Sequence, residues 1–156
     1  MTTPLSSGAS GTDIGGDGHY SFVIRPDMKL AFFRFGGRMT AKLGRRCFEA
    51  YLADPAFDPS YTMVTDARAI TTIDAGFLDL MREICPLHAL LKQFDKGTAA
   101  VVLAGSDTAF GMARMLAQVL ETVSAIHLYV VDSEAESLAL AALPCESRLS
   151  EFLPAA

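Results

Sequence analysis

The chain of 156 residues is long enough for one domain with a substantial hydrophobic core. Its hydrophobic content of 51%, against 20% charged residues, excludes a wholly disordered chain. The formal net charge is −5, and Lys and Arg are scattered except at Arg45-Arg46, so we do not expect the basic surface that nucleic-acid binding needs.

The N-terminal part of the chain divides into a tail and a hairpin. Residues 1–19 are rich in Gly, Ser and Thr with few apolar side chains, which predicts a disordered tail. Residues 20–25 have the alternation of a strand, and residues 30–35 form a second strand after a proline-containing turn. The two strands should form an antiparallel hairpin that ends at Gly36-Gly37.

A helix and a strand follow the hairpin. Thr40 is a suitable N-cap, and Leu43, Cys47 and Tyr51 recur every four residues, which predicts a helix with one buried face. Residues 61–65 are an apolar run with β-branched side chains, and they predict the third strand.

The second helix is expected to begin near Asp74. Its apolar positions are spaced four, three, four and three residues apart, so they should share one face. Pro86 lies within this pattern and should kink or divide the helix, because it has no N–H group and crowds the preceding turn. The members of the predicted face are Phe77, Met81, Ile84, His88 and Leu91.

The C-terminal half repeats the alternation of strand and helix. Residues 98–104 are almost continuously apolar, which is typical of a strand buried on both faces. Gly105-Ser106-Asp107-Thr108 suits a tight turn and the N-cap of a third helix, and residues 126–131 form the fifth strand. Ser133 should cap a short last helix, and residues 144–156 are expected to be a loosely packed C-terminal extension.

These elements predict an α/β domain. Because each later strand returns through a helix, the chain should form a mixed, mostly parallel five-stranded sheet, with an N-terminal β-hairpin and helices mainly on one face. The other face would then expose apolar residues such as Val23, Leu30 and Phe32 to solvent. We therefore expect a homodimer that forms through this bare face.

The central stretch resembles a known family. The third strand ends at Asp66, residues 67–73 form a connector, and Asp74-Ala75-Gly76 stands at the start of the next helix. With the element order over residues 20–143, this resembles the STAS domain of anti-anti-sigma factors and its SpoIIAA-like relatives, which are also similar to the lipid-binding CRAL-TRIO fold. In STAS domains a serine follows this aspartate and is phosphorylated. Ala75 occupies that position here, so the phosphorylation switch does not transfer.

The resemblance and the topology place candidate residues at the carboxyl edge of the parallel strands, where ligands gather in open α/β sheets. Asp74 and Ser106 also have a structural interpretation as helix caps, and Arg114 as a solvated or carboxylate-paired side chain. The candidates for a binding or switch loop are Asp66, Arg68, Asp74, Ala75, Gly76, Ser106, Asp107 and Arg114.

Cysteine usage favours a reduced compartment. Cys47, Cys85 and Cys145 form neither a disulfide framework nor a zinc pattern. Without the pattern of a signal peptide or an apolar run of membrane length, the expected location is cytoplasmic. Cys85 and His88 are three residues apart, but Pro86 separates them, so a thiol enzyme is the least favoured hypothesis. We expect no cofactor and no metal.

Two functions remain in competition. The STAS resemblance favours a non-catalytic interaction or regulatory module that acts through residues 66–76. The alternative is a carrier or binder of a lipid or small apolar ligand, which the CRAL-TRIO likeness and a content of ten Phe and seven Met suggest. The alternative requires a cavity of roughly a few hundred Å³ lined by apolar side chains.

Overall fold

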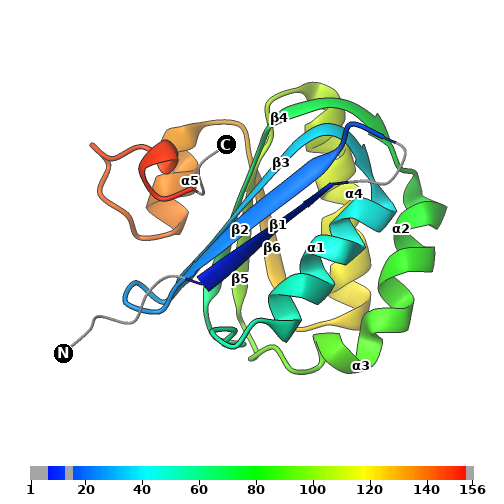
Figure 1. The fold of residues 1–156 in the computed structure, drawn as a ribbon, viewed down its shortest axis with the longest axis horizontal. Helices are drawn as coiled ribbons and strands as arrows, with labels where there is room; N and C mark the ends of the chain where they lie inside the picture. The colour runs from blue at the N-terminus through cyan, green and yellow to red at the C-terminus, as the bar shows by residue number, and fades with distance from the viewer. Residues whose placement is uncertain (1–6, 13–15, 154–156) are drawn as a thin grey trace.

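The structure, a computed structural model, describes residues 7–12 and 16–153 (Figure 1). The strands in this part of the chain are β1 (Ser7–Thr12), β2 (His19–Arg25), β3 (Leu30–Thr40), β4 (Thr62–Asp74), β5 (Ala99–Leu103) and β6 (His127–Val131). The helices are α1 (Ala41–Ala53), α2 (Phe77–Ile84), α3 (His88–Leu91), α4 (Asp107–Val123) and α5 (Glu134–Leu140), with 3₁₀ turns η1 (Cys85–Leu87) and η2 (Leu149–Glu151).

The strands form one sheet in the order β1-β2-β3-β4-β5-β6. β2 is antiparallel to both β1 and β3, whereas β3, β4, β5 and β6 run parallel to one another. This confirms the predicted hairpin followed by parallel helix–strand repeats. The sheet of the described residues has one strand more than predicted, which is β1.

β1 lies where the sequence predicts a disordered tail, and the prediction is wrong for this segment. The strand pairs with β2 along its whole length. The prediction was based on the lack of apolar side chains, whereas an edge strand is held by backbone hydrogen bonds to its neighbour. Gly8 shows the closeness of this pairing, because an added Cβ would collide with the Phe22 carbonyl group. Residues 1–6 and 13–15 of the predicted tail lie outside the described residues.

β3 and β4 continue beyond their predicted ends. The sequence predicts that Gly36-Gly37 ends the hairpin and that residues 67–73 form a connector. Instead, residues 36–40 of β3 pair with residues 69–74 of β4. Register shifts beside the glycines, with a φ of 72° at Gly37, allow the two strands to stay paired past this point. Most of the predicted loop is therefore a strand.

Side-chain caps begin three of the helices, as the sequence predicts. The Oγ1 atom of Thr40 accepts a hydrogen bond from the Leu43 N–H at 3.1 Å and begins α1. Ser106 begins α4 and Ser133 begins α5 in the same way. The predicted face of α1, with Leu43, Cys47 and Tyr51, is buried.

The second predicted helix differs from the prediction in two respects. It begins at Phe77 with Gly76 as its N-cap, so Asp74 is the last residue of β4 and not part of the helix. Pro86 divides the helix through η1, as predicted. The predicted buried face is wrong at Phe77 and His88, which are both exposed. Phe77 is the first residue of α2, whereas His88 follows the 3₁₀ turn, whose tighter winding shifts the phase of the helix. The buried residues of this region are Leu80, Glu83, Leu87 and Leu91.

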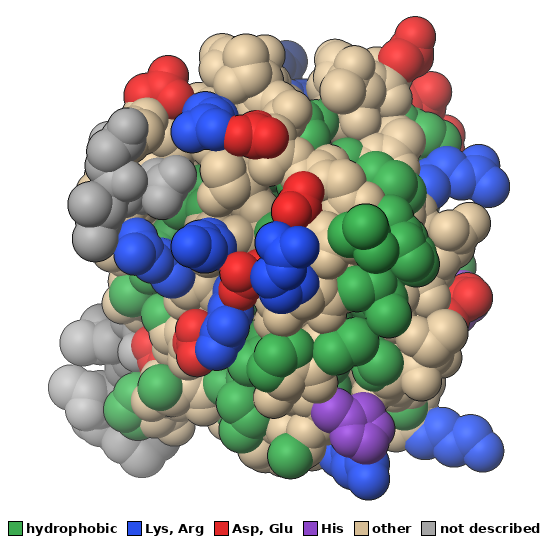
Figure 2. Space-filling view, turned by 90° about the vertical axis from the view of Figure 1, so that its right-hand side faces the viewer, with side chains coloured by type: hydrophobic (Ala, Val, Ile, Leu, Met, Phe, Trp, Pro, Cys, Tyr) green, Lys and Arg blue, Asp and Glu red, His purple; other side chains and the backbone are tan. Residues whose placement is uncertain are grey.

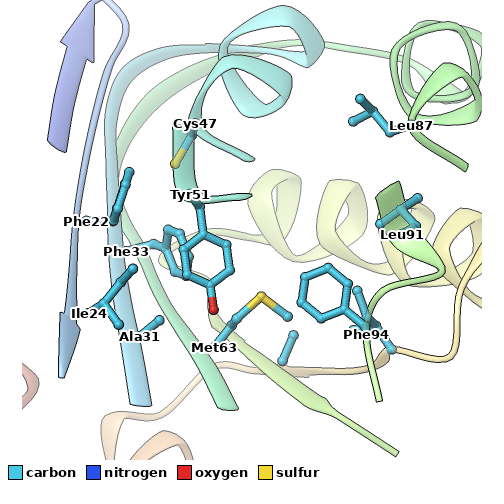
Figure 3. Packing of buried hydrophobic residues seen from close by; sticks show 12 residues of the cluster. Phe22, Ile24, Ala31, Phe33, Cys47, Tyr51, Met63, Leu87, Leu91 and Phe94 are labelled. Atoms are coloured by element: carbon cyan, nitrogen blue, oxygen red, sulfur yellow. The ribbon is translucent and has the colours of Figure 1, made fainter. Parts of the chain in front are cut away.

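Helices α1, α2, α3 and α4 cover one face of the sheet (Figure 1). Figure 3 shows Cys47 and Tyr51 of α1 pointing towards Phe22 and Phe33 of the sheet. The rings of Phe33 and Tyr51 meet edge to face at 5.0 Å. This face contains the larger core cluster of the described residues, and the predicted placement of helices mainly on one face is confirmed.

The opposite face is not bare, which corrects the premise of the predicted homodimer. α5 and residues 149–153 pack on it (Figure 1). Phe32 and Phe152 stack with their ring centroids 5.4 Å apart, and Leu149 is completely buried. The C-terminal extension is thus a packed part of the domain up to residue 153, because its apolar residues cover the apolar face of the sheet. A dimer through a bare face has no basis in this structure.

Candidate ligand cavity

A cavity of about 170 Å³ lies between the sheet and the four helices on its first face. All its lining residues are apolar except Arg45 and Thr65. The strands contribute Phe33, Phe35, Met39, Met63, Thr65, Ala67, Ile70, Ala100, Val102 and Leu128. The helices and turns contribute Ala41, Gly44, Arg45, Cys47, Phe48, Leu80, Ile84, Leu87, Leu91, Met112, Ala113, Leu116 and Leu120, and Ile126 completes the lining.

Small residues at facing positions leave this space open. Ala67 and Ala100 lie on neighbouring strands, and Gly44 and Ala113 lie on helices above them. An added Cβ at Gly44 would meet only the terminal methyl group of Met39, at 3.3 Å. The three lining methionines have flexible side chains that can adapt to an occupant. The local sequence therefore produces a deformable apolar cavity.

An ion pair connects two helices beside the cavity. The Nη1 atom of Arg45 on α1 donates a hydrogen bond to Oε2 of Glu83 on α2 at 3.1 Å. The Nε atom of Arg45 also lies 3.3 Å from the Glu49 carboxylate. The hydrogen bond to Glu83 and the charge of Glu49 raise the pKa of the Arg45 guanidinium. Two carboxylates for one guanidinium give the cluster a net charge of about −1 at neutral pH.

The ion pair marks where the cavity approaches the surface. The Arg45 side chain lines the cavity and is 36% exposed, so it reaches from the interior to solvent. Figure 2 shows the molecule from the side of α2, where positive and negative side chains alternate and hydrophobic side chains lie beside them. Residues of α1 and α2 thus give the cavity a polar outer boundary on this side.

Cys47 contributes an apolar surface to the cavity. The residue is buried, and burial raises the pKa of its thiol, so the thiol remains protonated at neutral pH. A protonated, buried thiol packs as a small hydrophobic group and is a poor nucleophile. The cavity lining therefore offers apolar contact but no activated thiolate.

Asp66 and Arg68 lie together, but their contacts are structural. With Glu134 they form a cluster of ion pairs that we call the clamp. The buried Asp66 carboxylate accepts hydrogen bonds from the Nε and Nη2 atoms of Arg68, both at 3.0 Å. Arg68 Nη1 donates to Glu134 on α5 at 2.8 Å, and Glu134 in turn accepts from the Leu149 N–H at 3.0 Å. Burial opposes ionisation of Asp66, but hydrogen bonds from Arg68 outweigh it and lower the pKa of the carboxyl. The clamp joins β4 to α5 and η2.

The other candidates lie apart from this clamp. Eight residues of extended strand separate Asp66 from Asp74, a distance of roughly 25 Å. Asp74 is ion-paired with Arg38. Ala75 follows Asp74, and the Gly76 N–H donates to Asp79 Oδ2 at 2.9 Å at the start of α2. The structure therefore does not form the predicted groove that includes both Asp66 and Asp74.

The start of α4 is close to the clamp without joining it. Gly105 packs against the Arg68 backbone, where an added Cβ would come within 2.9 Å of the Arg68 Cα. Ser106 uses its hydroxyl group as the helix cap, and Asp107 is exposed in the first turn. Arg114 lies in a separate groove between α4 and β6. Ser106 is therefore a helix cap, as its structural interpretation predicts.

The thiol hypothesis gains no geometric support. Cys85 is half-buried in η1, His88 is exposed at the start of α3, and no hydrogen bond between them occurs in the structure. Among residues 7–12 and 16–153, no group of three potential metal ligands occurs. Within the same part of the chain, no helix has the length and apolar content to span a membrane.

Sequence reasoning missed Arg45, Glu83 and the positions of the small residues. A signal for Glu83 was present, because Leu80 and Leu87, about one helical turn before and after it, are apolar. The high Phe and Met content did suggest a cavity. Its place could not be derived from composition, because it depends on which small residues face one another across layers.

Comparison with known proteins finds no matching family model and no matching curated protein. Among solved structures, the chain is similar to the crystal structure of an uncharacterized DUF3478-family protein with a SpoIIAA-like fold from Shewanella loihica PV-4. The two are 13% identical with a TM-score of 0.44, over 90% of this chain and 98% of the other. The likeness says nothing about ligand or activity.

Proposed function

We propose that the chain binds a small, neutral, apolar molecule in the cavity between the sheet and helices α1 to α4, without converting it chemically. The observation that carries this proposal is the apolar cavity of about 170 Å³. Protein interiors are normally close-packed, with few voids larger than a water molecule. A cavity with this lining is therefore a binding-site candidate.

The size of the cavity limits the size of the ligand. An apolar cavity of about 150 Å³ is large enough to hold benzene or xenon. The adaptable side chains of Met39, Met63 and Met112 allow some expansion. The proposed ligand is therefore a single-ring or two-ring aromatic molecule, or a short branched hydrocarbon of similar volume.

The charge distribution favours a neutral ligand. The polar boundary of the cavity has two carboxylates, Glu49 and Glu83, for the single guanidinium of Arg45. A ligand carboxylate would be repelled by this cluster and would lose its hydration inside the cavity. Toluene and benzoate have similar size and differ in charge, so they form a suitable pair of test ligands.

The experiment measures thermal unfolding and NMR chemical shifts with toluene and with benzoate. Toluene at 100 times its Kd should stabilise the fold by about 2.7 kcal/mol, which corresponds to a rise in Tm of roughly 5–10 °C. Benzoate at the same concentration should have little effect. Unchanged Tm and unchanged chemical shifts with toluene would refute the proposal.

Two variants of α4 provide a matched test. Ala113 lines the cavity, so Ala113→Leu should fill it and abolish toluene binding while the fold remains stable. Ala109 is buried on the same helix outside the lining, so Ala109→Leu should destabilise the fold by about 1–3 kcal/mol yet retain binding. This pair separates loss of the cavity from loss of stability.

A non-catalytic interaction module is the second candidate, and a surface feature supports it. Phe77 and Leu78 follow the Asp74–Gly76 segment and are 46% and 74% exposed. Adjacent exposed hydrophobic residues are typical of protein-binding surfaces. A photo-crosslinking residue at position 78 should capture a partner in native extract, and one at exposed position 92 should not. Equal labelling at both positions would count against this role.

A further inference from the structure

β6 is an outer strand of the sheet with a free edge. The His127 N–H donates to the Thr98 carbonyl at 2.9 Å, and the Val131 carbonyl accepts from the Ala104 N–H at 2.9 Å. Backbone groups of successive residues point to opposite sides of a strand, so Leu128 and Val130 direct theirs away from β5. Within the described ranges, no strand pairs with this outer edge.

The sequence of β6 does not protect this edge. Natural edge strands commonly contain Lys, Pro or a bulge that prevents pairing with another sheet. β6 reads His-Leu-Tyr-Val-Val and pairs with β5 in unbroken register. β1, at the opposite edge, consists of Gly, Ser, Ala and Thr. The free edge of β6 is therefore the one suited to strand addition.

A groove beside β6 contains two charged residues without partners. Arg114 and Glu121 lie on α4, and both are exposed. Among the described residues, none forms an ion pair or hydrogen bond with either side chain. They are seven residues apart, or about 10.5 Å along the helix axis, and Ala117 lies near the middle of the interval. The groove has a volume of about 360 Å³ and also includes Leu128 and Val130.

We propose that two copies of this chain pair through antiparallel β6 strands, so that Arg114 of each copy meets Glu121 of the other across the two-fold axis. An axis through Tyr129, perpendicular to the sheet, places Leu128 opposite Val130 of the second copy. Both residues can then exchange backbone hydrogen bonds. The same axis reverses one α4 relative to the other, which brings the unlike charges together.

The neighbouring side chains suit a second copy better than another occupant. In a two-fold dimer the same surface patch of both copies is in contact. One Arg and one Glu on either side of the axis therefore form two equivalent ion pairs, each between the two copies. Ala117 at the centre has a small side chain, which allows the two helices to approach closely. Tyr129 is 39% exposed, and pairing would bury part of its ring. This interface uses the edge of the sheet and leaves the face under α5 unchanged.

Charge reversal provides the test, with sedimentation equilibrium and light scattering on the full chain. Arg114→Glu alone and Glu121→Arg alone should each weaken self-association by roughly tenfold or more, because like charges then meet. An equimolar mixture of the two variants should form a mixed dimer at least as tight as the wild-type dimer. Lys92→Glu, which changes an exposed charge on another surface, should leave self-association unchanged.

Each outcome either supports or overturns the proposal. A mixed dimer from two variants that are monomeric alone supports it, even if one variant is less stable. A wild-type chain that is monomeric at all concentrations overturns it, as does a dimer that neither reversal weakens. Binding of a strand from a different protein at β6, without self-association, would also overturn the choice of a second copy.

Discussion

The two faces of the sheet differ in how completely they are covered. One short helix and a five-residue segment seal the face that contains Phe32, Val64, Val101 and Leu103, all with 1% exposure or less. Four helices cover the opposite face, yet a cavity of about 170 Å³ remains beneath them. The number of covering elements therefore does not determine how densely a face is packed. The volumes of facing side chains do.

The faces also differ in the ion pairs that hold their helices. Arg68 joins the buried Asp66 to Glu134, and this clamp attaches α5 and η2 to the sheet. Arg45 joins Glu83 on α2 to α1 near the surface, beside the cavity. One ion pair closes a packed core, whereas the other connects two helices above a binding space. Each of the following predictions tests part of this contrast.

The largest effect should come from removing the segment that seals the α5 face. A chain that stops after Leu143 loses Leu149, Phe152 and Leu153. Burial of three large apolar side chains contributes about 5–9 kcal/mol, which is comparable to the whole stability of a domain. We expect the shortened chain to aggregate or unfold in urea-denaturation experiments.

A point variant provides the control for this truncation. Leu149→Ala should destabilise the fold by about 3–5 kcal/mol, whereas Ser150→Ala at the exposed neighbouring position should change the free energy of unfolding by less than about 0.5 kcal/mol. A shortened chain with normal stability would show that the α5 face does not depend on its C-terminal cover.

Two buried leucines allow the packing of the faces to be compared directly. Leu138 on the α5 face is 2% exposed, and Leu91 beside the cavity is 1% exposed. Leu138→Ala should reduce the free energy of unfolding by about 4 kcal/mol and Leu91→Ala by about 2.5 kcal/mol, because part of the Leu91 surface already lacks contacts. Equal losses in urea denaturation would mean that the two faces are equally well packed.

The sequence predicted the elements whose signals are local. The caps at Thr40, Ser106 and Ser133, the break at Pro86 and the buried strand before Gly105 depend on neighbours within a few residues. The extension of β3 and β4 beyond Gly36-Gly37 depends on pairing between distant segments, so the local glycine signal was misleading.

The candidate site was harder to predict for the same reason. Asp66 and Arg68 were singled out as binding or switch residues, but Glu134 is 66 residues away from Arg68 in the sequence, and only the structure shows that Arg68 is already paired. The homodimer prediction assumed a bare sheet face, and this assumption was wrong because residues 149–153, which have few local signals, cover that face.

The clamp of the α5 face should make stability depend on acid pH. The pKa of Asp66 is lowered in the fold, so its contribution is full above the unfolded pKa of about 4 and is lost as the pH falls through the lower folded value. Asp66→Asn should reduce the free energy of unfolding by about 1–3 kcal/mol at pH 7 and flatten its dependence on pH below 4.

Asp27 is a matched control for Asp66. It also pairs with an arginine two residues away, Arg25, and its pKa is lowered by that hydrogen bond, but it is exposed in a turn. Asp27→Asn should leave the acid limb of the stability profile almost unchanged. If both variants behave alike, the clamp has no special role in holding α5.

Among the described residues, one buried side-chain oxygen lacks a hydrogen-bond partner, and it lies in the core of the cavity-containing face. The Tyr51 hydroxyl group is buried without a hydrogen-bond partner, and burial raises its pKa (Figure 3). Tyr51→Phe should therefore raise the free energy of unfolding by about 1 kcal/mol, because it removes a desolvated polar group. Tyr61→Phe, at a half-buried position, is the control. A loss of stability in Tyr51→Phe would show that the hydroxyl group is satisfied in solution.

The smallest predicted effect is on the rate of ligand exchange, and it distinguishes the two partners of Arg45, Glu83 and Glu49. Glu83→Gln weakens the connection between α1 and α2, so toluene exchange should accelerate roughly two- to five-fold, the factor expected for a partly exposed ion pair. Glu49→Gln weakens a contact within α1 alone and should leave the rate unchanged. NMR line-shape analysis measures both rates, and equal acceleration would exclude the α1–α2 connection as the controlling contact.

The most direct test of the cavity is diffraction from crystals held under xenon pressure. Xenon enters apolar cavities of this size, and its anomalous scattering locates it. We predict a xenon peak between the sheet and helices α1 to α4, bordered by Ala100, Met112 and Ala113, and its loss in Ala113→Leu. The absence of a peak there, or an equal peak on the α5 face, would contradict the proposed binding site.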